Sequence, residues 1–109
     1  MMYYEFTAGN NTYKLRLNTR NIVALEQKLG CNPVMVFGMT GETIPTVSTM
    51  VVILHASLQA LQHGISLDDA YNIFDAYIED GNATTDFAKV ILEIYKASGI
   101  IPKEADEKN

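Results

Sequence analysis

The chain has 109 residues, of which 48% are hydrophobic, and a formal net charge of −5. This length is enough for one compact domain, and the acidic balance argues against a non-specific coat of nucleic acid or anionic membrane. The single cysteine leaves no internal disulfide and no multi-cysteine zinc site, and the longest apolar run is far shorter than the roughly 20 residues that span a bilayer.

The first predicted element is a β-hairpin over residues 3–17. Strand-forming residues precede the turn sequence Ala-Gly-Asn-Asn at 8–11, and apolar and polar side chains alternate from Thr12 to Leu17. An isolated hairpin is only marginally stable in water and has to cover another element. We expect this hairpin to pack on the helix that follows it.

That helix is predicted over residues 19–30, because the apolar spacing changes from two residues to three or four at Ile22. Asn18 or Thr19 can cap its first turn, and Gly30 provides a left-handed stop. The proline and glycines that follow predict a short helical turn over residues 33–37 and a mobile loop over residues 38–43.

Three more helices are predicted, over residues 46–63, 67–80 and 86–98. Pro45 suits the first turn of the first of them, and Ser66 and Asp69 have the spacing of a capping box for the second. Thr84 or Thr85 can cap the third.

The charged residues 103–109 are predicted to form a flexible tail, which leaves a single domain over residues 1–102. The predicted fold class is α+β and mainly α: an N-terminal β-hairpin followed by about four helices, packed as one small domain.

The helix over residues 46–63 is apolar around most of its circumference near residues 50–54. Such a helix either lies at the centre of a domain or meets another chain along one side. Because this helix and the one over residues 86–98 carry more apolar residues than a narrow stripe needs, we predict a partner-binding surface on them. The alternative is that the same residues are the core of a monomer. The candidate residues are Val47, Met50, Val51, Leu54, Leu58, Leu61, Val90, Ile91 and Ile94.

Charge is divided unevenly along the chain. Residues 1–45 contain four basic and three acidic residues, for a balance of +1, and residues 46–109 contain four and ten, for a balance of −6. Opposite signs on one small domain favour head-to-tail self-association or a charged partner, and Arg16 and Arg20 are the candidate contacts. The alternative is an ordinary solvated surface.

No set of residues predicts catalysis, and no cofactor or metal site is expected. His55 and His63 are eight residues apart, whereas two zinc ligands on one helix are four apart. Cys31 follows a helix C-terminus, which disfavours a thiolate, so we expect a small apolar filler there. A helix-turn-helix over residues 46–80 would direct carboxylates at a phosphate backbone, which argues against DNA binding.

The segments YKLRLNTR and IVALEQKLG, residues 13–20 and 22–30, resemble the N-terminal region of tail assembly chaperones from long-tailed phages and prophages of Gram-positive bacteria. The resemblance covers most of residues 3–100. The later similar features are Asn32-Pro33 before a short apolar turn, Ile44-Pro45 before a long apolar helix, and a charged tail.

The resemblance implies a non-catalytic protein that coats the apolar tape measure protein, keeps it soluble until the tail tube polymerises, and is absent from the finished tail. It also implies a longer form made by ribosomal frameshifting near the end of the gene. The expected partners are therefore the tape measure protein, further copies of this chain and the longer form, in the cytoplasm of the bacterial host. The alternative function is a structural tail or head-completion protein that stays in the virion.

Overall fold

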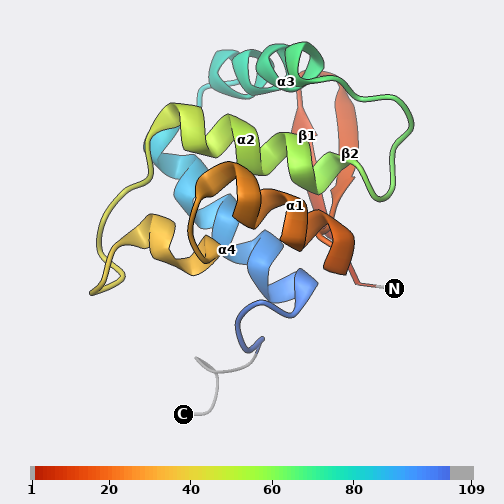
Figure 1. Cartoon of the computed structure of the whole chain (residues 1–109). Coiled ribbons are helices and arrows are strands. Elements are labelled where there is room, and N and C mark those ends of the chain that lie inside the picture. Colours follow the sequence, from red (N-terminus) through yellow and green to blue (C-terminus); the bar gives the residue numbers. More distant parts are fainter. Residues whose placement is uncertain (1, 104–109) are drawn as a thin grey trace.

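The computed structural model describes residues 2–103. It contains a two-stranded antiparallel sheet, four α-helices and two short 3-10 helices (Figure 1). These elements are β1 (Tyr4–Ala8), β2 (Asn11–Leu15), α1 (Thr19–Leu29), η1 (Pro33–Phe37), α2 (Val47–Leu58), α3 (Leu67–Glu79), η2 (Thr84–Asp86) and α4 (Phe87–Ser98). The predicted fold class, a hairpin followed by four helices in one small domain, is confirmed. The predicted tail lies, apart from Lys103, outside the described residues.

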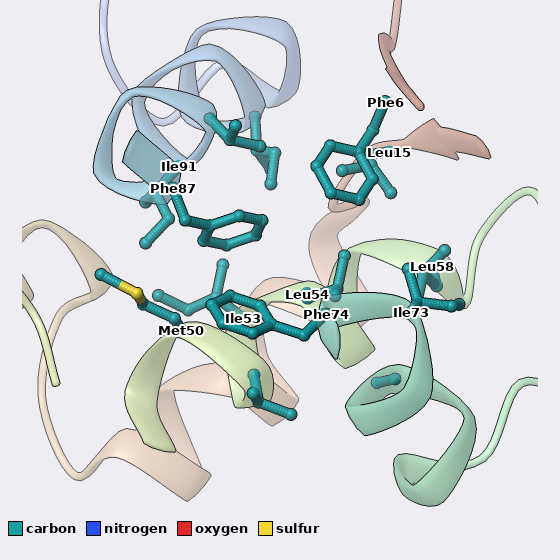
Figure 2. Close-up of a cluster of buried hydrophobic side chains, with 14 of the residues drawn as sticks. Phe6, Leu15, Met50, Ile53, Leu54, Leu58, Ile73, Phe74, Phe87 and Ile91 are labelled. Carbon is teal, nitrogen blue, oxygen red and sulfur yellow. The ribbon is translucent and has the colours of Figure 1, made fainter. Parts of the chain in front are cut away.

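Helix α2 lies at the centre of the molecule. It packs against α1, α3, α4 and β2, so most of its circumference is covered by other parts of the same chain (Figure 1). Figure 2 shows side chains from the hairpin and from α2, α3 and α4 converging on one cluster. Four aromatic rings contact one another inside it, with centroid separations between 5.1 and 6.1 Å: Phe6, Phe74, Tyr77 and Phe87. No helix within residues 2–103 has the length and apolar character needed to cross a membrane.

The hairpin pairs in the register Tyr4 with Leu15 through Ala8 with Asn11. Its apolar face packs mainly on α2, α3 and α4 and not, as predicted, on α1. The turn is attached to α3, because the Gly9 N–H donates a 2.8 Å hydrogen bond to Asp80 Oδ2. The prediction was wrong because the partners of this face, such as the aromatic rings of α3 and α4, are distant in the sequence.

Helix α2 ends at Leu58, five residues before the predicted end. The turns that follow are bonded to the hairpin, because the Gln62 Nε2 donates to the Lys14 carbonyl as well as to the Leu58 carbonyl. Its Oε1 also accepts from the Lys14 N–H, so Gln62 bonds to both backbone groups on the outer edge of β2.

The helix starts follow local capping chemistry. Asn18 and Asn21 form a reciprocal box at α1, and Ser66 and Asp69 form the predicted box at α3. Helix α2 begins after Thr46, which caps it, so Pro45 lies outside the helix. The predicted threonine caps of α4 are not found, because η2 directly precedes this helix. Asp86, the last residue of η2, accepts a hydrogen bond from the Ala83 N–H through its carboxylate.

Candidate partner-binding surface

Most of the apolar residues predicted to bind a partner are buried inside the domain. Each of them is at most 6% exposed, because α1, α3, α4 and the hairpin surround α2, and α4 turns its apolar face to the same core. The core interpretation therefore applies to Met50, Val51, Leu54, Leu58, Val90, Ile91 and Ile94. The apolar circumference of α2 accordingly gives no reason to expect a second chain against it.

Two predicted apolar residues have a different environment. Leu61 is half-buried in the turns that follow α2. Val47, in the first turn of α2, is 45% exposed. Of the nine apolar candidates, Val47 is therefore the one whose side chain is open to a partner.

The two predicted arginines also differ. Arg16 is half-buried, and its Nη1 donates to the carbonyl oxygens of Met2 at 2.8 Å and Ala97 at 2.9 Å. Because Ala97 lies in the last turn of α4, this guanidinium caps a helix C-terminus, where a cation is favoured. Arg20 is exposed on α1 and makes no hydrogen bond or ion pair with any of residues 2–103. Arg16 thus has a structural role, and Arg20 remains open to contacts.

Exposed apolar residues are concentrated in the segment that runs from η1 to the first turn of α2. Of the ten large hydrophobic residues exposed within residues 2–103, four fall within the thirteen residues 35–47. They are Met35, Met39, Ile44 and Val47, with exposed fractions of 39, 90, 52 and 45%, and we call them the apolar loop surface.

This surface is nearly free of charge. Glu42 is the only Asp, Glu, Lys or Arg between Lys28 and Asp68. Isolated exposed hydrophobic residues are normal, but a segment that combines several of them with so little charge is typical of an interaction site.

The segment that carries this surface is attached to the core. The Tyr95 hydroxyl donates a buried 2.9 Å hydrogen bond to the Pro33 carbonyl, and the Tyr95 ring lies edge-on to Phe37 at 6.3 Å. Burial raises the pKa of Tyr95 far above its ordinary value, so the hydroxyl keeps its proton and remains a donor. The Thr43 N–H returns to the Phe37 carbonyl at 2.8 Å and closes the loop. The predicted short turn is confirmed, and the loop has a defined attachment to it.

Gly38 sets the direction of the loop. Its φ of 80° is strained for any residue with a side chain, and an added Cβ would lie 2.5 Å from Thr43 Oγ1. The sequence predicts only a mobile loop over residues 38–43, so none of its residues was among the predicted partner contacts. The signal available was Met35, Met39 and Ile44 in a segment with one charged residue.

Other chemistry is sparse in the described part of the chain. Within residues 2–103, no group of three or more His, Cys, Asp or Glu side chains is placed to hold a metal ion. Cys31 is exposed, so the predicted apolar filler is wrong. His55 is half-buried, and its pKa is lowered, first by burial and second by the charge of Lys28.

Comparison with known proteins gives a family without an assigned activity. No curated protein and no solved structure matches the chain. The sequence model of DUF6096, a family of unknown function, matches residues 5–109. This match covers nearly the whole chain, and the protein therefore belongs to the DUF6096 family.

Proposed function

We propose that this protein is a phage or prophage tail assembly chaperone, which binds the tape measure protein and keeps it soluble in the host cytoplasm while the tail is built. The observation that carries the proposal is the apolar loop surface, held on a small domain by the Tyr95 hydroxyl. The resemblance of residues 13–30 to that family, and the similar layout after them, supply the identity of the client. The function is binding without catalysis.

The chemistry of the surface suits such a client. Long amphipathic helices present apolar stripes, and a binder meets them with apolar anchors at its own surface. Met35 and Met39 have unbranched, flexible side chains, which adapt to stripes of irregular shape better than branched residues do. The acidic charge on the rest of the chain keeps the complex in solution.

Co-expression tests the proposal. The client to co-express is the tape measure protein, which we expect to be the product of a long, helix-rich reading frame directly downstream of this gene. The readout is the soluble fraction of that client after lysis. The wild-type chain should keep the client soluble, and a Met39→Ser/Ile44→Ser double variant should return most of it to the pellet. Leu92→Ser is the matched control, since Leu92 is an exposed apolar residue on α4 outside the surface.

The melting temperature of each variant has to match that of the wild type, so that unfolding does not explain a loss. If the client is equally soluble with wild type and double variant, the apolar loop surface is not the contact. If the client is equally soluble without the protein, the chaperone proposal is wrong.

The composition of finished particles separates the proposed function from a structural one. A chaperone leaves before the tail is complete, so mass spectrometry of purified virions should detect the tape measure protein without this chain. Stoichiometric amounts of the chain in virions would instead identify a structural tail or head-completion protein. The longer frameshifted form remains a prediction, and a second product with the same N-terminal peptides in infected or induced cells would verify it.

A further inference from the structure

The exposed side of α1 is hollowed. Thr19, Arg20, Val23, Ala24 and Gln27 line a shallow depression of about 390 Å³. It adjoins an apolar pocket of about 80 Å³ between α1 and α2, whose walls are Asn21, Ala24, Leu25, Lys28, Val52, His55, Ala56 and Gln59. Ala24 belongs to both, so the depression and the pocket form one continuous surface, which we call the α1 groove.

Two cations stand at the ends of this groove. Arg20, Ala24 and Lys28 follow one another at intervals of four residues, which places them in one row along the helix. Eight residues of helix separate the two cations by about 12 Å along the axis. The groove therefore presents a basic group, an apolar centre and a second basic group.

The exposed side of α3 has the opposite pattern. Asp68, Tyr71 and Asp75 are all exposed, and their spacing of three and four residues places them on one face. The seven residues between the two aspartates correspond to about 10 Å along the axis. Tyr71, with 49% of its surface exposed, stands between two carboxylates.

These four charged side chains have no bonding partner in the described part of the chain. Neither Arg20 nor Lys28 on α1, and neither Asp68 nor Asp75 on α3, forms an ion pair or side-chain hydrogen bond with any of residues 2–103. Helix α2 lies between α1 and α3, so the two patterns face different directions (Figure 1). One molecule cannot bring its own two faces together.

We propose that α3 of one copy docks in the α1 groove of a second copy, with Tyr71 in the pocket between α1 and α2 and the two aspartates beside Arg20 and Lys28. The spacings of about 10 and 12 Å allow each carboxylate to reach one cation. Tyr and Arg are enriched among the few residues that dominate the binding energy at interface centres.

The contact is heterologous, because each copy uses one face to receive and another to insert. Such contacts repeat from copy to copy and build rings or open filaments. The inference concerns the purified chain alone and does not depend on the identity of the client. It extends the proposed function by explaining how several copies line up along an elongated partner.

Two complementary variants test the geometry. Variant one, Arg20→Glu/Lys28→Glu, has a damaged groove and an intact α3 face. Variant two, Asp68→Asn/Asp75→Lys, has an intact groove and a damaged α3 face. In sedimentation velocity, the wild-type chain should show an average mass that grows with concentration, and each variant alone should stay at 12.1 kDa. An equimolar mixture should form a dimer and nothing larger, because only one intact pair of faces exists. Circular dichroism melts verify that both variants fold.

Tyr71→Ala measures the anchor and should weaken association about tenfold or more. Leu92→Ala, an exposed apolar residue on α4, is the matched control and should leave association within about twofold of wild type. The proposal is overturned if the wild-type chain remains at 12.1 kDa at every concentration. It is also overturned if variant one or variant two on its own associates as well as wild type, or if the mixture of the two does not form a dimer.

Discussion

Val47 and Val51 are the same residue type, one turn apart in the same helix, and they have opposite environments. Val47 is 45% exposed beside the loop that precedes α2, and Val51 is 2% exposed in the core. Hydrophobic spacing places both on one side of a helix but does not say where along that side the covering elements stop. The neighbouring elements cover Val51 and leave Val47 open to solvent, so only Val47 is a candidate contact.

The largest expected effect tests this comparison directly. Val51→Asp places an uncompensated carboxylate in the core and should lower the free energy of unfolding by roughly 3 kcal/mol or more. Val47→Asp should change the free energy of unfolding by less than about 0.5 kcal/mol, because its carboxylate remains in water. Urea titrations followed by circular dichroism provide both values. Equal destabilisation by the two changes would mean that Val47 is also core.

The two arginines extend the comparison to charged residues. Arg16→Ala should cost about 2 kcal/mol, since it removes charged hydrogen bonds to Met2 and Ala97 and leaves the last turn of α4 uncapped. Arg20→Ala should leave the unfolding free energy of the monomer unchanged, because this side chain has no partner within residues 2–103. Urea titrations at low protein concentration separate these effects from self-association. A neutral Arg16→Ala would show that its hydrogen bonds do not stabilise the domain.

The two tyrosines test the attachment of the apolar loop surface. Tyr95→Phe removes one buried hydroxyl and leaves the Pro33 carbonyl without its donor, so we expect a loss of about 1 kcal/mol. Tyr71→Phe, on the exposed side of α3, should have no measurable effect on stability. Hydrogen exchange should also be faster in residues 33–44 of the Tyr95→Phe protein. Unchanged exchange there would show that Tyr95 does not hold the segment.

The smallest expected effect concerns pH. Burial, and secondly the charge of Lys28, lower the pKa of His55 in the folded state from its ordinary value of 6.5. The unfolded chain therefore binds this proton more readily, and the associated stability is complete above pH 6.5 and lost as the pH falls through the folded pKa. The urea midpoint should decrease slightly between pH 7.5 and 5.5, and His55→Gln should reduce that decrease. An equal slope in both proteins would assign the pH effect to other groups.

The sequence was a sufficient guide to the elements wherever the decisive interaction is local. The caps at Asn18 and Ser66 each depend on a partner three residues away, and the stop at Gly30 depends on its own backbone freedom. The turn in the hairpin and the helical turn after Pro33 belong to the same class. Interactions of this range are encoded in consecutive residues, so they could be predicted without the fold.

Other features could be found only in the tertiary structure, because they depend on contacts between residues that are distant in the sequence. The role of Arg16 depends on Ala97, and the attachment of the turns after α2 depends on Gln62 reaching Lys14. The burial of Val51 depends on all the elements around α2. The exposure of Val47 and Met39 was decided in the same way, since no element within residues 2–103 covers these two side chains. The spacing of apolar residues predicts which side chains favour an apolar environment. Only the tertiary structure shows whether residues of the same chain provide that environment.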